Sequence, residues 1–311
     1  MTALAPALPV IESREDRDFP SQEEVVKAAV PPLGSRQQII RAALLLLAVI
    51  AFSLIVELLL VSPLQQRAAQ QRAFDSFRKN AAAGTAPLAA GELKGKKGAP
   101  VAYLEARSIG LHQVILEGTD GGDLFKGPGH RRDTPIPGQA GTSVILGRQA
   151  AFGGPFDDIS NLRKDAVIRA TTGAGVFDYR VIGVRRSGDP APPALRAGGG
   201  RIVLVTANGA RFAPSGLLLV DADLIVPGLG GPGPLFTAKT LPDTEKLMSI
   251  DTTTLWRLAL WLQALLVVVL AAIWSWQRWN PAKTWIVFLP ALLLVGLFTA
   301  GEAARLLPNL L

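Results

Sequence analysis

The apolar residues form three long segments, with a region of short alternating runs between the first and the second. Residues 42–62 are apolar apart from Glu57, and two further mainly apolar segments cover residues 255–276 and 285–307. A helix rises about 1.5 Å per residue, so about 20 residues cross a hydrocarbon core of roughly 30 Å. The pattern therefore predicts three transmembrane helices, at residues 42–62, 255–276 and 285–307.

The segments that flank these helices are polar or rich in turn-forming residues. Residues 1–41 are mixed in charge and interrupted by proline, and we expect a cytoplasmic tail with one short helix over residues 22–29, where a serine and a glutamate have capping-box spacing. Residues 63–100 favour helix and then turn to alanine, glycine and lysine, which predicts a juxtamembrane stalk followed by a linker. Residues 227–254 are predicted to be a second linker, because glycine and proline recur in them.

Short runs typical of β-strands occupy residues 101–226. We expect strands over residues 101–109, 111–117, 142–146, 166–171, 176–185, 202–206 and 217–226. Brief helical segments are expected near residues 120–125 and 156–162. The runs at residues 202–206 and 217–226 are separated by a ten-residue loop rich in turn-forming residues, which indicates a hairpin or two adjacent strands. Several runs are apolar on both faces, as in a closed barrel that is also covered from outside. The sequence thus predicts a mainly β fold: a closed β-barrel of seven to eight strands with two short helices, plus three transmembrane α-helices.

The positive residues near the apolar segments predict an orientation in the membrane. Arg36 and Arg41 precede the first segment, and Arg278 and Lys283 lie between the second and the third. Short basic segments stay on the cytoplasmic side. We therefore predict a multi-pass protein of the cell membrane with three spans, a cytoplasmic N-terminus and an extracytoplasmic barrel.

Composition limits the chemistry that the chain can carry. Hydrophobic residues make up 49% of the 311 residues, and the formal net charge is +7. No basic run is interleaved with aromatic residues, so we expect membrane lipid and no nucleic acid as the partner of this charge. The sequence has no cysteine and two histidines, which excludes thiolate sites and multi-histidine metal sites. No metal and no cofactor are predicted.

Five short motifs follow one another within residues 101–226. They are IGLHQVILEGT at residues 109–119, LFKGPGH at 124–130, PGQAG at 137–141, FGGPF at 152–156 and LVTA at 204–207. In this order and spacing they resemble motifs of the sortases, the membrane-anchored cysteine transpeptidases of Gram-positive bacteria, and in particular of actinobacterial class E and related sortases. The resemblance implies that the predicted barrel is a sortase-type barrel.

The resemblance also implies where catalytic residues would stand. Active sortases carry a histidine after the strand that corresponds to residues 142–146, a cysteine at the end of the next-to-last strand and an arginine at the start of the last strand. In this chain these positions fall on Arg148, Ala207 and Gly216, or a residue beside Gly216. Alanine has no nucleophilic atom, and a guanidinium does not shuttle protons at neutral pH. We therefore predict no catalytic residues and expect that the chain is not an enzyme.

Three hypotheses about function follow from these observations. In the first, the chain is a membrane-anchored pseudoenzyme that binds a cell-envelope or membrane protein, or a sorting-signal-like peptide, in a groove that includes Arg148, Thr206, Asn208 and Arg211. In the second, it is an active sortase-like transpeptidase or peptidase in which Thr206 or Ser215 replaces the nucleophile. In the third, it is a structural subunit of an envelope membrane complex that is held by its transmembrane helices.

Overall fold

The structure is a computed structural model that describes residues 35–311 apart from residues 94, 235, 251, 279 and 280. The expected helix over residues 22–29 and most of the expected tail lie outside the described residues. The chain divides into two compact units, residues 1–44 and 45–311. The described part of the first unit belongs to helix α2 (Ser35–Val56), which continues into the second unit.

Among the described residues, three helices are long and apolar enough to cross a membrane by length and composition. They are the helix that begins with α2, then α5 (Leu255–Arg278) and α6 (Pro281–Ala304). Within the second unit, Leu265 and Val269 of α5 and Leu292 of α6 pack together with Val49 and Ile50 of α2. The prediction of three candidate membrane-spanning helices is confirmed.

The segment after α2 packs on the barrel instead of standing apart from it. A π-helical turn, η1 (Glu57–Val61), leads into α3 (Ser62–Ala82). The Gln70 side chain of α3 forms two hydrogen bonds with the backbone of Val114. The Val114 N–H donates to Gln70 Oε1 (2.7 Å), and Gln70 Nε2 donates to the Val114 carbonyl (3.1 Å). Ala90 and Leu93 of the short helix η2 (Ala90–Leu93) lie in the barrel core. The stalk and linker expected over residues 63–100 therefore contribute to the folded domain.

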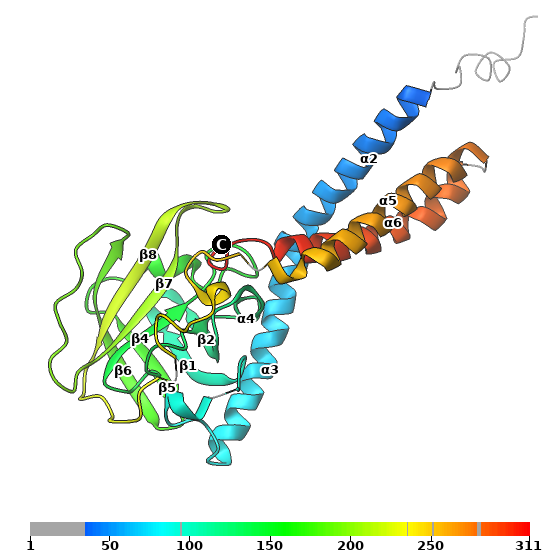
Figure 1. The fold of residues 1–311 in the computed structure, drawn as a ribbon. Coiled ribbons are helices and arrows are strands. Elements are labelled where there is room, and N and C mark those ends of the chain that lie inside the picture. The colour runs from blue at the N-terminus through cyan, green and yellow to red at the C-terminus, as the bar shows by residue number, and fades with distance from the viewer. Residues whose placement is uncertain (1–34, 94, 235, 251, 279–280) are drawn as a thin grey trace, which may run out of the picture. The chain divides into compact units, whose positions relative to one another are not determined.

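Eight strands form the closed barrel (Figure 1). They are β1 (Pro100–Ala106), β2 (Leu111–Glu117), β3 (Gly129–His130), β4 (Gly141–Leu146), β5 (Val167–Thr172), β6 (Gly175–Arg186), β7 (Gly200–Ala210) and β8 (Ala213–Leu224). Around the barrel their order is β1-β2-β3-β4-β7-β8-β6-β5. The short helices α4 (Gly121–Leu124) and η4 (Asp157–Asn161) lie where helical segments are expected. The predicted fold class is confirmed, and the two-residue strand β3 is an addition to it.

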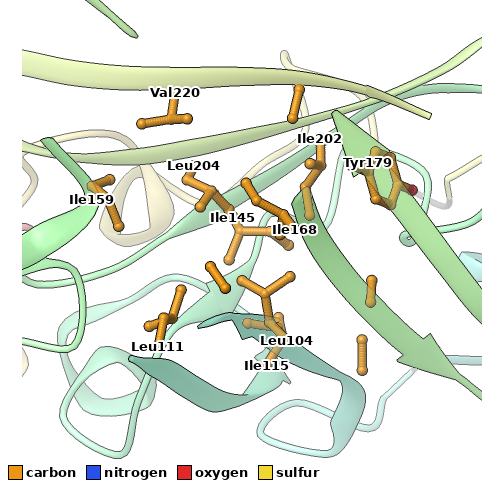
Figure 2. Packing of buried hydrophobic residues seen from close by; sticks show 14 of the residues in the cluster. Leu104, Leu111, Ile115, Ile145, Ile159, Ile168, Tyr179, Ile202, Leu204 and Val220 are labelled. Carbon is orange, nitrogen blue, oxygen red and sulfur yellow. The ribbon is translucent and has the colours of Figure 1, made fainter. Parts of the chain in front are cut away.

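The interior of the barrel is filled by branched aliphatic side chains. Leu104, Ile145 and Leu204 come from three different strands and lie in one cluster, which Figure 2 shows together with Tyr179. The Tyr179 hydroxyl accepts a hydrogen bond from the Gly138 N–H (2.6 Å), so this polar group is satisfied inside the core. Burial raises the pKa of Tyr179 to about 12.

The β7–β8 connection differs from the expected ten-residue loop. The two strands stay paired from Arg201 and Asp223 to Ala210 and Ala213, with an irregularity between Asn208 and Gly209. Gly209 has φ +116°, a left-handed value that glycine adopts readily. A bulge thus accommodates the turn-forming residues within the ladder, and the result is a long hairpin instead of a loop. Figure 1 shows this hairpin reaching beyond the barrel wall.

Three short 3₁₀ helices complete the described elements. η3 (Arg107–Ile109) connects β1 to β2, whereas η5 (Asp243–Glu245) and η6 (Thr252–Thr254) lie between β8 and α5. The region around η5 contacts the barrel: Thr119 Oγ1, just after β2, donates to the Glu245 carbonyl (2.8 Å). Residues far along the chain are thereby fixed beside the end of β2.

Candidate functional site

Arg148 lies just beyond the end of β4, next to the end of β7. The two strands are parallel neighbours, and the Gly147 N–H extends their ladder by donating to the Val205 carbonyl (3.0 Å). The Arg148 side chain is 0% exposed. Burial lowers the pKa of its guanidinium to about 9, so the group still carries its charge at neutral pH. The structure thus holds a buried cation at the position that the sequence comparison singles out.

The described hydrogen-bond partners of this guanidinium are backbone carbonyl oxygens. Nη1 donates to the carbonyls of Pro308 (3.3 Å) and Leu311 (3.2 Å), and Nη2 donates to the carbonyl of Gly121 in α4 (3.3 Å). The guanidinium carbon also lies 4.7 Å from the centre of the Phe152 ring. Carbonyl dipoles and an aromatic face compensate a buried positive charge in part. Arg148 therefore binds the main chain of residues 308–311.

The 308–311 segment is fixed by a second set of contacts around Asn309, which is 0% exposed. Asn309 Nδ2 donates to the carbonyls of Thr119 (3.0 Å) and Lys246 (2.8 Å) and lies 3.2 Å from Ser249 Oγ. The Asn309 N–H donates to the Ser249 carbonyl, and the Gln149 N–H donates to the Leu310 carbonyl (3.0 and 2.9 Å). In Figure 1 the end of the chain lies beside α4, in agreement with these bonds.

Leu310 covers an apolar patch on the outside of the barrel, which we call the β4–β7–β8 face. Its residues are Val144, Leu146, Val203, Val205, Ala207, Leu217 and Leu219. Leu310 is 0% exposed and Ala207 is 1% exposed, and both belong to this cluster together with Leu124 of α4. Side chains alternate along a strand, so Val203, Val205 and Ala207 share one side of β7. Ala207 thus lies in the patch that the 308–311 segment covers.

Thr206 points to the other side of β7. It alternates with Ala207 and shares its side with the core residue Leu204. Its side chain is buried, and its Oγ1 has no hydrogen-bond partner among the residues that the structure describes. His130 is also buried, and both of its nitrogens are engaged: Nδ1 lies 2.8 Å from Glu117 Oε2, and Nε2 lies 3.1 Å from the Pro135 carbonyl.

The remaining candidate residues lie on the β7–β8 hairpin. Arg211 is largely exposed and forms an ion pair with Asp157 of η4. Ser215 Oγ donates to the Asn208 carbonyl (3.3 Å), and Gly216 pairs with Asn208 across the hairpin. Gly216 has φ +151°, a value that disfavours a residue with a side chain. The structure therefore gives Arg148 and Arg211 different surroundings: one is buried under residues 308–311, and the other lies at the hairpin tip.

An acidic cluster borders the 308–311 segment. Lys97 pairs with Asp120, and its Nζ lies 3.6 Å from Asp123 and 3.7 Å from Glu245. Burial, together with the nearby Asp120 carboxylate, raises the pKa of Asp123 to about 7. Within the described part of the chain, no group of three or more histidine, cysteine, aspartate or glutamate side chains could hold a metal ion.

The comparisons with known proteins identify the barrel. Residues 104–211 match the family described as "Sortase domain". Over 89 residues the chain is 32% identical to Sortase D of Bacillus subtilis (strain 168). Residues 104–211 therefore carry a sortase domain. This stretch is 29% of the chain and 43% of the relative, so the chain spans less than half the length of this sortase.

Two solved sortase structures are similar to this chain over about half of its length or less. One is a Sortase D5 transpeptidase of Clostridium perfringens, which is 22% identical; the match covers 51% of this chain and 99% of that chain, with a TM-score of 0.42. The other is sortase E from Streptomyces avermitilis, 28% identical, which covers 42% of this chain and 90% of that chain with a TM-score of 0.35.

The sortase assignment corrects one prediction. From the residues at positions 148, 207 and 216 we expect that the chain is not an enzyme. This prediction is contradicted, because the family whose model residues 104–211 match is a family of enzymes, and the curated relative is itself a sortase. The residues at three positions do not decide whether the chain is an enzyme. The match to the family rests on all of residues 104–211.

The sequence did not reveal residues 308–311 as part of the site. They follow the last apolar segment and contain leucine, proline and asparagine, a composition that also suits the end of a membrane helix. Only the folded chain brings Pro308 and Leu311 to Arg148, 160 and 163 positions earlier in the sequence. The sortase domain and the residues beyond its matched region form the site together.

Proposed function

We propose that this protein is a membrane-anchored sortase-type protein that recognises a short peptide of a cell-envelope protein at the β4–β7–β8 face. One observation carries the proposal: the buried Arg148 guanidinium binds the backbone carbonyls of Pro308 and Leu311, which lie at the two ends of a hydrogen-bonded turn. Every peptide presents such carbonyls, and hydrogen bonds from a charged donor are the strong ones. The apolar patch next to Arg148 supplies room for a side chain, as is usual in peptide recognition.

The membrane arrangement that supports this function has residues 1–41 in the cytoplasm and the barrel of residues 101–226 outside. Residues 42–62, 255–276 and 285–307 are the three spans in this proposal, and residues 63–100 and 227–254 connect them to the barrel. The basic residues Arg36, Arg41, Arg278 and Lys283 support this orientation. It brings the barrel to the side of the membrane where envelope proteins are exposed.

The binding experiment uses the protein in detergent and labelled peptides that copy the C-terminal sorting signals of envelope proteins from the same cell. Fluorescence anisotropy measures their binding to the protein with and without the Arg148→Gln substitution, in each case after removal of residues 308–311, because those residues occupy Arg148 in the intact chain. Loss of a charged donor that binds two carbonyls costs about 1.5–3 kcal/mol, so we expect roughly 10- to 100-fold weaker binding.

Arg163→Gln is the matched control, because Arg163 is exposed on the loop after η4. In the same shortened chain, this substitution should leave peptide binding unchanged. Thermal unfolding of each variant shows whether the barrel is intact. Equal peptide binding by the shortened protein with and without Arg148→Gln, both folded, would contradict the proposed role of Arg148, and absence of binding for every sorting signal would contradict the proposed function.

A second candidate function is peptide transfer with Thr206 as the nucleophile. The observation that favours it is the buried Thr206 Oγ1, which has no hydrogen-bond partner in the described residues. Thr206 faces the core side of β7, so this reaction requires the end of β7 to turn Oγ1 toward the bound peptide. In this reaction Oγ1 would bond to the carbonyl carbon of the peptide, the C–N bond would break, and the amine would leave with the hydroxyl proton.

Intact-mass measurement after incubation with the same peptides tests this second candidate. A covalent adduct on the wild type that is absent from Thr206→Val, which has nearly the same shape, would support Thr206 as the nucleophile. The variant Ser215→Ala tests the alternative hydroxyl in the hairpin. An adduct that persists in both variants would exclude both residues as the nucleophile.

A further inference from the structure

The 308–311 segment is bound in two distinct side-chain pockets, and these pockets indicate which peptides the face accepts. The first surrounds the carboxamide of Asn309 with three oxygen atoms: the carbonyls of Thr119 and Lys246 and the hydroxyl of Ser249. Carbonyl oxygens accept hydrogen bonds and cannot donate them. This pocket therefore selects a group with N–H donors, such as a primary amide.

The second pocket is apolar and receives the next side chain, Leu310. Its walls are Leu124, Leu146, Val205 and Ala207, and Leu310 is fully buried there. Ala207 of β7 has a small side chain and lies in the same cluster as Leu310. A polar side chain in this pocket would lose its hydration without a described partner, which is unfavourable.

Arg148 lies beside the two pockets and binds the main chain on both sides of them. Its Nη1 reaches the carbonyls of Pro308 and Leu311, which flank Asn309 and Leu310, while the Gln149 N–H binds the Leu310 carbonyl. The segment is therefore bound through its side chains at two positions and through its backbone at all four residues, since the Asn309 N–H also donates to the Ser249 carbonyl.

We propose that the β4–β7–β8 face is a peptide site specific for an asparagine followed by leucine, and that residues 308–311 occupy it as an internal competitor. The inference rests on the proposed function, because it names the peptide class that the same face recognises. An external peptide of this class binds only after the segment has left. The segment is joined to α6 by a few residues, so its effective concentration at the site is on the order of millimolar or higher.

The test uses a labelled peptide that copies residues 306–311, Leu-Leu-Pro-Asn-Leu-Leu, and an isomer in which the asparagine and the leucine after it are exchanged. Three proteins are compared in detergent: the full-length wild type, a variant that lacks residues 308–311, and Asn309→Asp. The aspartate keeps the shape of the side chain but replaces the donor by an acceptor that faces three oxygens. Thermal unfolding identifies which of the variants are folded.

We expect either folded variant to bind the copied peptide at least tenfold more tightly than the wild type does. The same variant should bind the copied peptide at least tenfold more tightly than the isomer. Equal affinity for the two peptides, or equal affinity of wild type and variants, would overturn the inference. If sorting-signal peptides bind in an Arg148-dependent manner while the copied peptide does not bind, the proposed function stands and this inference falls. If no peptide of either kind binds, both fall.

Discussion

Replacing Leu310 by alanine tests how firmly the 308–311 segment is held on the barrel. Leu310 is fully buried among Leu146, Val205 and Ala207. Removing a buried leucine side chain typically costs about 2–5 kcal/mol. We expect the segment to detach locally, without global unfolding, and we take the lower end of this range, about 2 kcal/mol, as the expected loss in the free energy of detachment.

Hydrogen exchange of single backbone amides measures this detachment. The Gln149 N–H is bonded to the Leu310 carbonyl (2.9 Å) and exchanges when the segment leaves. Since 1.4 kcal/mol corresponds to a factor of ten, Leu310→Ala should exchange this amide about 30-fold faster. The Gly147 N–H, bonded to the Val205 carbonyl (3.0 Å) within the barrel, serves as the internal reference and should change little.

Leu88→Ala is the matched control, because it makes the same chemical change at a leucine that is 53% exposed. We expect no change at either amide in this protein. The reasoning is refuted if the Gln149 amide exchanges at the wild-type rate in Leu310→Ala. It is also refuted if the Gly147 amide accelerates by the same factor, because the segment would then not detach independently of the barrel.

Three further predictions concern the barrel, and chemical or thermal denaturation in detergent measures each. The pKa of Asp123 is raised to about 7 in the folded protein, so the folded state binds this proton more tightly, and stability falls as the pH rises from about 4 to 7. Asp123→Asn should remove this fall, which amounts to at most about 4 kcal/mol, and an unchanged pH profile would contradict the assignment. Tyr179→Phe leaves the buried Gly138 N–H without its acceptor and should cost about 1–3 kcal/mol; a cost near zero would show that the bond contributes nothing. Gly129→Ala should lower the melting temperature, because a Cβ there would meet the Gly118 carbonyl oxygen, and wild-type stability would contradict this close approach.

The strand pattern and the short motifs were sufficient to predict the barrel. Alternating apolar runs and turn-forming residues mark seven of the strands, and local sequence determines both features. The pairing of the last two strands was predicted, but the length of the β7–β8 hairpin was not, because Asn208 and Gly209 signal a turn, whereas in the structure they form an irregularity within a continued ladder. Local composition does not distinguish a loop from a bulged hairpin.

The site was predictable only in part. Arg148 was identified through the resemblance to sortases, as the residue at the position of their histidine, but its burial and its carbonyl partners depend on residues 308–311. Such contacts join positions far apart in the sequence, and hydrophobic periodicity contains no information about them. The grouping of Arg148 with Arg211 failed for the same reason, since Arg211 is held by Asp157 at the hairpin.

Photo-crosslinking in native membranes tests most directly whether the β4–β7–β8 face binds an envelope protein. A photo-reactive amino acid replaces Leu217, a partly buried residue of this face, in the variant that lacks residues 308–311. A second probe replaces Trp256 of α5, which is 61% exposed. The account predicts that the probe at position 217 forms adducts with the sorting signal of an envelope protein and that Arg148→Gln abolishes them. Adducts formed only by the probe at position 256 would contradict the account and assign partner binding to the membrane helices.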